Sequence, residues 1–245
     1  QMCIRDRHVD TPIDEVVQLI EKYDLVAVPV VDSIGRLVGR ITVDDVMDEV
    51  REQAERDYQL ASGLSQDVET DDSVFRQTTA RLPWLLIGMI GGIGNSMILG
   101  NFDSTFAAHP EMALYIPLIG GTGGNVGTQS SALVVQGLAN SSLDAHNTWK
   151  QIVKESVVAV INATIISMLV YIYNFIRFGA TATVSYSVSV SLFAVVMFAS
   201  IFGTLVPMTL EKLKIDPAIA TGPFISITND IIGMMLYMGI TVLLS

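Results

Sequence analysis

Five long stretches with almost no charge fill the second part of this 245-residue chain. Four of them have no charged side chain and the fifth has one, Asp230; they cover residues 82–102, 112–143, 156–176, 178–210 and 217–245. A helix needs about 20 apolar residues to cross the hydrocarbon core of a bilayer. We therefore expect five transmembrane helices, because a soluble fold would have to bury five such helices in a very short segment.

The charged residues are concentrated before these stretches. Residues 1–82 hold 18 acidic and 9 basic side chains, whereas residues 83–245 hold 7 and 5. The chain therefore divides into an acidic, water-soluble part and an apolar part in the lipid bilayer. No basic stripe is present, so the composition argues against a nucleic-acid partner.

The connections between the apolar stretches predict an orientation in the membrane. Six basic residues lie before the first stretch, between the second and third, or between the fourth and fifth: Arg76, Arg81, Lys150, Lys154, Lys212 and Lys214. The alternate connections hold one, Arg177. Basic residues favour the cytoplasmic side. We expect a multi-pass protein of the plasma (inner) membrane with a cytoplasmic N-terminus and an external C-terminus.

The soluble part follows a pattern of helix, strand, turn, strand and helix. Residues 14–23 have helical spacing, LVAVPVVD and LVGRITV are strands on either side of a turn at 33–35, and Thr42 is placed to cap the next helix. The opening QMCIRDR is given no structural weight. The pattern resembles the second unit of a CBS-domain pair, whose G-x-x-T-x-x-D motif matches Gly39 to Asp45. That resemblance implies ATP or another adenosine nucleotide at Thr42 and Asp45, and a helix cap without ligand explains the same residues.

A strongly acidic helix follows the second strand. Residues 44–57 hold seven acids and only two bases, Arg51 and Arg56. Like charges on one helix repel by tenths of a kcal/mol per pair, and divalent cations relieve such repulsion. The pattern therefore fits either a helix face that is simply solvated or a regulatory metal site. The candidate ligands of that metal site are Asp45, Asp48, Glu49, Glu52, Glu55 and Asp57. We take residues 1–50 as the CBS unit, 51–81 as the acidic connecting helix and polar linker, and 82–245 as the transmembrane domain.

Asp230 is the one charge in the last apolar stretch. It lies 13 residues after Pro217, and an ionised carboxylate at that depth costs several kcal/mol unless it faces water or a cation. Ser226 and Gly222 precede it on the same helical face. Pro223 has no amide hydrogen, so we expect it to free a backbone carbonyl within the span. A protonated or hydrogen-bonded structural Asp is the alternative.

The second apolar stretch contains PLIGGTGGNVGTQSS, with four glycines in five residues. We expect an interrupted span, because irregular backbone at membrane depth is tolerated where it is buried in protein or lines water. Close helix packing is the other explanation for the glycines. Asn125 and Gln129, four residues apart, share a face, which favours a pore wall with Gly124 nearby.

The candidate ligands are all oxygen atoms, which disfavours zinc, copper and iron. Mg²⁺ keeps most of its waters and takes one or two carboxylates, whereas Ca²⁺ requires more direct ligands. One Asp per chain therefore fits Mg²⁺ better.

The motifs together resemble the MgtE-type magnesium channel family. The resemblance rests on the CBS unit, the acidic helix, Arg81 to Trp84, PLIGGTGGNVGTQSS, and residues 215–233 with GPFISITND. It implies an α-helical membrane protein of five transmembrane helices after an α/β CBS unit, and a homodimer with the pore between protomers. It also implies hydrated Mg²⁺ at Asp230, with Asn125, Gly222 and Ser226 nearby and Gln129, Asn229, Gly124 and Pro223 along the pore, and closure by cytosolic Mg²⁺. Upstream family domains are missing from this sequence.

Three other functions fit parts of the pattern less well. A proton-coupled exchanger of divalent cations (Mg²⁺ or Co²⁺) stays open, because a carboxylate binds protons as well as metals. An intramembrane aspartyl protease requires two close carboxylates, and no second deep acid is evident, so we do not expect an enzyme. Anion transport is disfavoured because the apolar stretches contain no base.

Overall fold

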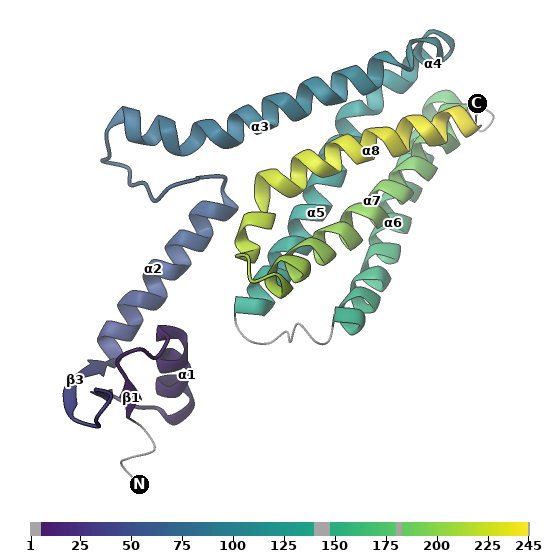
Figure 1. The fold of residues 1–245 in the computed structure, drawn as a ribbon. Helices are drawn as coiled ribbons and strands as arrows, with labels where there is room; N and C mark the ends of the chain where they lie inside the picture. The colour runs from purple at the N-terminus through teal and green to yellow at the C-terminus, as the bar shows by residue number, and fades with distance from the viewer. Residues whose placement is uncertain (1–5, 140–147, 180–182, 245) are drawn as a thin grey trace. The chain divides into compact units, whose positions relative to one another are not determined.

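The computed structural model describes residues 6–139, 148–179 and 183–244 and divides into two compact units, residues 1–58 and 59–245 (Figure 1). Most of the opening segment, residues 140–143 of the second apolar stretch, residues 180–182 of the fourth and Ser245 lie outside the described residues. Each unit is described by itself.

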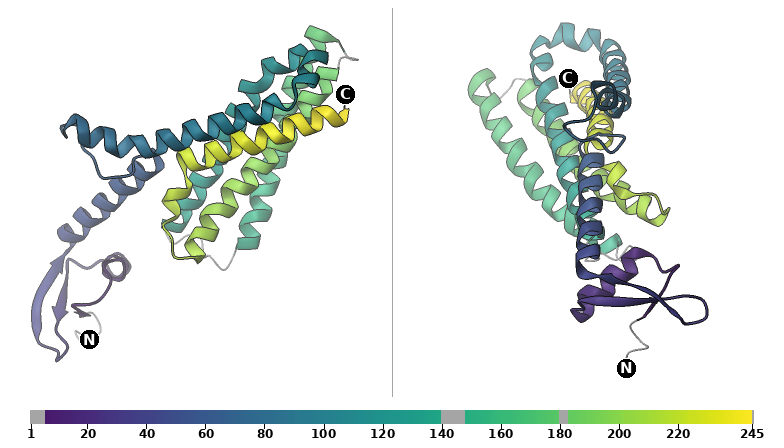
Figure 2. Two further views of the ribbon diagram at one scale, coloured as in Figure 1. Left: turned by 45° about the horizontal axis from the view of Figure 1, so that its top comes forward. Right: turned by 90° about the vertical axis from the view of Figure 1, so that its left-hand side faces the viewer.

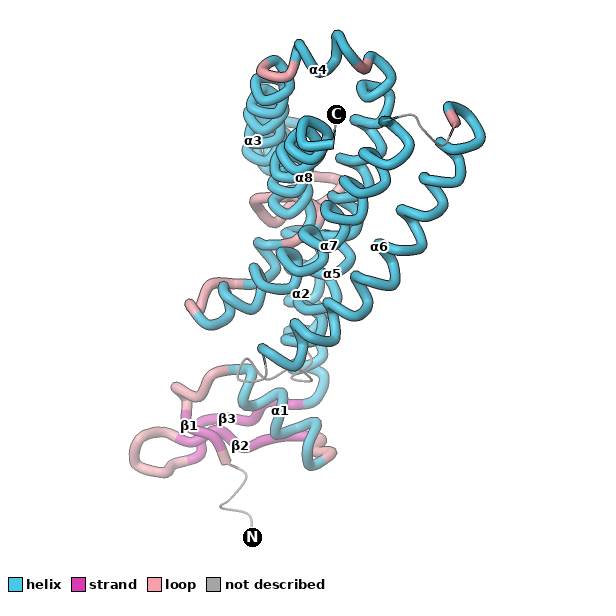
Figure 3. The backbone as a smooth tube through the Cα atoms, turned by 90° about the vertical axis from the view of Figure 1, so that its right-hand side faces the viewer, coloured by secondary structure: helices cyan, strands magenta, loops and turns pink. Residues whose placement is uncertain are grey.

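The N-terminal unit is a small sheet with helices. Its elements are β1 (Arg7–His8), α1 (Ile13–Tyr23), β2 (Ala27–Val31), β3 (Leu37–Thr42) and α2 (Val43–Ala61), which continues into the second unit. The strand order is β1-β2-β3, with β1 parallel and β3 antiparallel to β2 (Figure 3). The predicted order of helix, strand, turn, strand and helix is confirmed. Arg7, to which the sequence analysis gave no weight, pairs with Val30 in the sheet.

A single apolar cluster holds this unit together. Its buried members come from α1, β2 and α2 and are Val16, Leu19, Ile20, Val28 and Val46. The spacing of the first three is that of one helical face. The turn between β2 and β3 is stabilised by Asp32, whose Oδ1 accepts from the amides of Ile34 and Arg36 at 3.0 and 2.8 Å. The Arg36 amide is the main cause of a lowered pKa of the Asp32 carboxyl.

The start of α2 has the predicted cap. Asp45 Oδ2 accepts from the amide and the hydroxyl of Thr42 at 2.8 and 2.6 Å, and the Asp45 amide donates to Thr42 Oγ1 at 3.5 Å. This reciprocal arrangement is a capping box. The hydrogen bond from the Thr42 hydroxyl is the main cause of a lowered pKa of Asp45.

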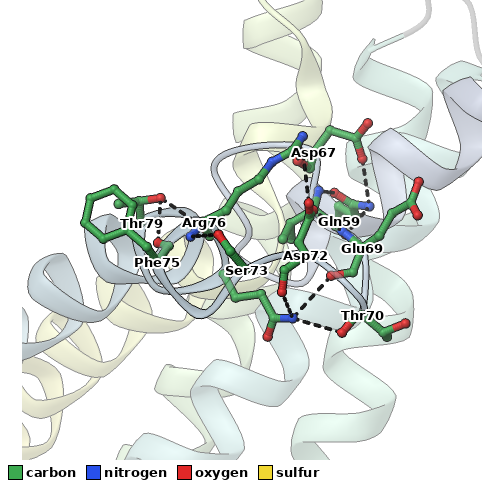
Figure 4. Close-up of polar contacts among 11 residues, drawn as sticks. Gln59, Asp67, Glu69, Thr70, Asp72, Ser73, Phe75, Arg76 and Thr79 are labelled. Atoms are coloured by element: carbon green, nitrogen blue, oxygen red, sulfur yellow. Dashed lines mark hydrogen bonds and ion pairs between the residues drawn. The ribbon is translucent and has the colours of Figure 1, made fainter.

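The polar segment after α2 is loop only as far as Ser73, because α3 begins at Val74. Side chains from both ends of this loop fold back on it (Figure 4). Gln59 bonds to Asp67 and Val68, and Arg76 pairs with Asp72 at 2.9 Å. The first apolar helix is therefore longer than expected from residues 82–102, and its polar first turns belong to the same helix.

The second unit is helical. Its elements are α3 (Val74–Gly100), α4 (Asp103–Ala108), η2 (Pro110–Tyr115), α5 (Ile116–Ala139), α6 (Thr148–Phe178), α7 (Thr183–Lys212), η4 (Pro217–Ala220) and α8 (Gly222–Leu244). α7 packs along α6, α5 packs against both α7 and α8, and α3 contacts α8 (Figures 1 and 2). The apolar core includes Met112, Leu192 and Tyr237, whose hydroxyl donates to the Met112 carbonyl at 2.8 Å.

Among the described residues, four helices are long and apolar enough to cross a membrane: Val74–Gly100, Trp149–Phe178, Thr183–Lys212 and Gly222–Leu244. α5 is 24 residues long but is not among the four, because its amide, hydroxyl and glycine residues lower its mean hydropathy. The fifth membrane span therefore stays a prediction. The apolar window of α3 is only 6% buried within the chain, against 56% for α7, so α3 leaves most of its surface for lipid or another protein.

Two expected interruptions are wrong. α5 is one continuous helix through all its glycines. Pro223 does not interrupt a helix either. It lies in the first turn of α8, where the backbone nitrogen has no helical hydrogen bond to make. It therefore frees no carbonyl inside a span, and Pro217 likewise begins the short helix η4. Helix α8 starts five residues after Pro217, so Asp230 is in its third turn, about 12 Å from the helix start.

Candidate cation site

The α5–α8 contact brings the Asp230 carboxylate against glycines. A Cβ built on Gly120 would lie 3.4 Å from Asp230 Oδ1, and one built on Gly124 would lie 3.6 Å from the same atom and 2.8 Å from Ser226 Oγ. Asp230 and Ser226 are four residues apart on α8, and the two glycines are four apart on α5. Two matching helix faces therefore meet: a methyl group on Gly120 would just touch the carboxylate, whereas one on Gly124 would displace the Ser226 hydroxyl.

Asp230 has no hydrogen-bond or ion-pair partner in the part of the chain that the structure describes. It is half-buried. A carboxylate in a membrane helix is costly unless it faces water or a cation. The geometry thus leaves a negative charge available to a ligand at the helix contact.

Asn229, expected among the pore-lining residues, is placed differently. It is 1% exposed and packs against Gly127, where a Cβ would collide with its Nδ2 atom. Both polar atoms of the amide lack a hydrogen-bond partner within the described part of the chain. Asn229 therefore faces the inside of the helix contact, and this position does not fit direct contact with a pore between protomers.

Asn125 and Gln129 lie on an adjoining face of α5. Both are exposed in the single chain, as is Gly121, one turn before Asn125, which has nothing within 4 Å of a built Cβ. The structure thus confirms that the two amides share a face. That face is next to the stripe of Gly120 and Gly124, so the amides border the Asp230 contact without being part of it.

The start of α8 touches the end of α2. Gly222 has a φ of +48°, and a Cβ on it would collide with the Ala61 carbonyl, so only glycine fits. A Cβ on Gly63 would in turn lie 2.6 Å from the Pro223 ring. Gly222 and Pro223 therefore pack closely against the end of α2 and the loop that follows it.

An open pocket of about 600 Å³ adjoins this contact. It is lined by Arg81 and Trp84 of α3 and by Pro223, Ser226 and Ile227 of α8, among others. Ser226 is the residue shared between the pocket and the Asp230 face. The pocket thus gives one end of the candidate site access to the surface of the unit.

The acidic face of α2 is partly neutralised by its own arginines. Arg56 pairs with Glu52 at 2.6 Å and Glu49 at 3.2 Å, and Arg51 pairs with Glu55 at 3.0 Å. Asp57 accepts from Gln53 at 2.9 Å, and Asp45 is taken up by the cap. Asp48 has no hydrogen bond or ion pair within the described part, so it is the candidate left with a free carboxylate.

A second carboxylate is buried in the helical unit and was not expected from the sequence. Glu155 of α6 is 8% exposed, and its Oε1 atom accepts hydrogen bonds from Ser130 of α5 and Ser200 of α7, each at 2.6 Å. It directly precedes an uncharged stretch, so by sequence it counted as the flank of a span. No pattern in the sequence places serines from two other helices beside it.

Within the described residues, no three His, Cys, Asp or Glu side chains lie close enough together to hold a metal ion. A site that strips a transition metal of its water requires several such ligands. The arrangement at Asp230 therefore suits a cation that keeps most of its water and meets one carboxylate per chain, as Mg²⁺ does.

Comparisons with known proteins agree with these features. Residues 116–240 match a family described as "MgtE: Divalent cation transporter", and residues 8–52 match the CBS domain. The chain is 35% identical over 227 residues to the magnesium transporter MgtE of Bacillus subtilis, covering 93% of this chain and 50% of that protein. It is 33% identical over 241 residues to the protein of the same name from Thermus thermophilus, covering 96% and 52%.

A third protein named magnesium transporter MgtE, from Enterococcus faecalis, is 30% identical over 233 residues, covering 95% of this chain and 51% of its own length. The chain spans about half the length of the curated relatives it matches. Its CBS match falls on the N-terminal unit, and its transporter match runs from the start of α5 almost to the end of α8. The chain is a multi-pass membrane protein, and it belongs to the MgtE family of divalent cation transporters.

Proposed function

We propose that this chain forms the membrane domain and one CBS unit of a magnesium transporter, in which hydrated Mg²⁺ passes against Asp230. The single observation that carries the proposal is the half-buried Asp230 carboxylate at the glycine-lined α5–α8 contact, which has no partner among the described residues. The three relatives of matching sequence are named magnesium transporters, which supports the choice of ion.

The proposed role of Asp230 is electrostatic. A fixed negative charge at bilayer depth lowers the energy of a cation that would otherwise lose its solvation there. Ser226, one turn earlier, offers a hydroxyl to the water shell of the ion, and the pocket beside Ser226 offers it access. Because Mg²⁺ gives up its waters reluctantly, one carboxylate per chain with polar groups around it is an adequate site.

We extend the proposal to a homodimer whose pore runs between the protomers. Asn125 and Gln129 form a polar face of α5 that is exposed in the single chain, and such amides are costly against lipid. A second copy would enclose that face in an aqueous path and bring two Asp230 carboxylates together. The distribution of Lys and Arg supports a cytoplasmic N-terminus and an external C-terminus.

We also propose that cytosolic Mg²⁺ regulates passage through the acidic helix α2, with Asp48 as the first candidate ligand. The excess of acidic over basic side chains on α2 supports this proposal. Arg51 and Arg56 reduce that excess, because they form ion pairs with three of the carboxylates. A nucleotide is not part of the proposal. The contacts of Thr42 and Asp45 are those of a helix cap, the alternative that the sequence left open.

The test is Asp230→Asn in the full-length protein, expressed in cells that lack other Mg²⁺ uptake systems. The variant keeps the size of the side chain, removes its charge and replaces one carboxylate oxygen with an amide NH2 group. We expect Mg²⁺ uptake to fall at least about tenfold, equivalent to about 1.4 kcal/mol of lost ion stabilisation, with unchanged membrane insertion. Wild-type uptake by this variant would overturn the site assignment.

Glu211→Gln is the matched control, because Glu211 is an exposed acid at the end of α7, away from the site. It should leave uptake unchanged. Parallel assays with Ca²⁺ and Co²⁺ in proteoliposomes test the ion: transport of either one without Mg²⁺ transport would reassign the substrate. A pH gradient applied without a Mg²⁺ gradient separates coupled exchange from a channel, since only an exchanger would then move Mg²⁺.

A further inference from the structure

Three oxygen atoms from three helices meet inside the helical unit. Glu155 Oε1 lies 2.6 Å from Ser130 Oγ and 2.6 Å from Ser200 Oγ, and the two hydroxyl oxygens are 3.1 Å apart. The three residues are 8%, 4% and 2% exposed. Ser130 lies about 14 Å before the end of α5 and Ser200 about 18 Å before the end of α7, at 1.5 Å per residue. The cluster is therefore well inside the bundle.

No base among the described residues neutralises the Glu155 carboxylate. Helix α5 contains no ionisable side chain at all, and those of α7, which are Tyr186, Glu211 and Lys212, lie eleven or more residues from Ser200. On α6 the neighbouring Lys154 is exposed. Two hydroxyl groups stabilise a carboxylate, but they carry no positive charge, so a buried charge would remain without a countercharge.

The serines can serve either charge state of the carboxyl group. A hydroxyl both donates and accepts a hydrogen bond, and it rotates to suit its neighbours. With the carboxylate ionised, both serines donate to it. With the carboxyl protonated, its O–H can donate to one serine, which then donates to the other across the 3.1 Å contact, where either oxygen can be the donor.

We propose that Glu155, with Ser130 and Ser200, is a proton-binding site of the membrane domain. A proton from water adds to a Glu155 oxygen, the charge changes from minus one to zero, and the hydroxyl hydrogens reorient without any bond to carbon changing. Because this cluster joins α6 and α7 to α5, and α5 also carries the glycines that face Asp230, the bound proton changes the rate of cation passage.

This last step rests on the proposed transport function, whereas proton binding does not. Infrared difference spectra of the full-length protein in lipid, taken between neutral and acid pH, measure protonation of carboxyl groups directly. We expect a carboxyl C=O band that is absent from Glu155→Gln. Ser200→Ala should keep this band but shift its frequency, because one hydrogen bond to the group is lost. Ser191→Ala is the matched control and should leave the band unchanged, since Ser191 is a buried serine of the same helix without a partner in the described chain.

Identical spectra of wild type and Glu155→Gln would overturn the proton site. Carboxylate bands that respond to Mg²⁺ or Na⁺ and not to pH would also overturn it, because the ligand would then be a metal ion. If Glu155→Gln does not fold, the frequency shift in Ser200→Ala decides the matter, and its absence contradicts the proposal.

Mg²⁺ flux into proteoliposomes over a range of pH tests the link to transport. We expect the flux of the wild type to vary with pH and that of Glu155→Gln to vary several-fold less. Equal pH dependence in both would refute the link. Absence of Mg²⁺ flux in the wild type would instead refute the proposed function, and the infrared result would stand by itself.

Discussion

The two units of this chain are held together in different ways. In the N-terminal unit, Val28 and its apolar neighbours form a core, and several acidic side chains at the surface are paired with arginines or backbone amides. In the helical unit, glycines set the distance between helices, hydroxyl groups are buried, and Glu155 and Asp230 have no basic partner within the described residues.

The difference follows from the surroundings of each unit. In water the burial of apolar side chains is favourable, so large apolar residues form the core of a unit that is surrounded by water. Lipid tails are as apolar as leucine, so membrane helices associate through close packing and through hydrogen bonds between buried polar groups. An acid costs little on a wet surface and several kcal/mol in the membrane. The acids of the helical unit are therefore better guides to function than the more numerous acids of α2.

The largest effect should come from a glycine contact between two helices in which backbone meets backbone. Gly203 of α7 faces the backbone of Gly127, and a Cβ on Gly203 would collide with the Gly127 carbonyl. Because neither backbone can rotate away, Gly203→Ala must separate α5 from α7, at a cost of about 3 kcal/mol. We expect a large loss of thermal stability in detergent, measured by size-exclusion chromatography of heated full-length protein.

Gly39→Ala in β3 provides the comparison in the other unit. A Cβ on Gly39 has nothing within 4 Å, so this variant should elute like the wild type after the same heating. An equal loss of thermal stability in Gly203→Ala and Gly39→Ala would contradict the distinction between the packing of the helical unit and that of the N-terminal unit.

A moderate effect is expected where a glycine meets a side chain. In Gly124→Ala the new methyl group would lie 2.8 Å from Ser226 Oγ, which can rotate away. The protein should fold, but the Ser226 hydroxyl would move from the Asp230 face, and Mg²⁺ uptake should fall several-fold. Gly239→Ala, on α8 with open space around it, should leave uptake unchanged. Misfolding of Gly124→Ala would show that this contact is as rigid as the one at Gly203.

The smallest effect concerns the exposed cap of α2. The Thr42 hydroxyl lowers the pKa of Asp45 below its ordinary value of 3.8, so the folded unit binds that proton less tightly than the unfolded chain does. This stabilisation of the folded unit is present at pH values above 3.8 and is lost as the pH falls through the lowered pKa of the folded state. Hydrogen exchange in the first turn of α2, corrected for the intrinsic effect of pH, should therefore quicken as the pH falls below 3.8.

Thr42→Ala should raise this exchange several-fold near neutral pH, in keeping with the loss of an N-cap. Asp45→Asn should remove the acid-dependent part. If acid still quickens exchange in Asp45→Asn as much as in the wild type, the cap does not depend on this carboxyl group.

The sequence predicted more of the fold than of the site. The helix-strand-turn-strand-helix order and the Thr42 cap follow from local rules on spacing and capping, and both are present. The stretch around Gly120 and Gly124 was misjudged as an interruption, because glycine both breaks helices and allows them to pack closely. Pro223 was misjudged for a related reason, since its effect depends on whether it stands inside a helix or in its first turn.

The sequence alone established a membrane protein with a soluble acidic unit and one deep acid, because charge and hydropathy are properties of each segment by itself. Only the tertiary structure decided that Asp230 has no partner within residues 6–139, 148–179 and 183–244, that Asn229 is buried, and that Glu155 meets two serines. These facts depend on which faces of distant helices meet. The rotation of a helix about its axis is fixed by packing against its neighbours, which hydropathy does not encode.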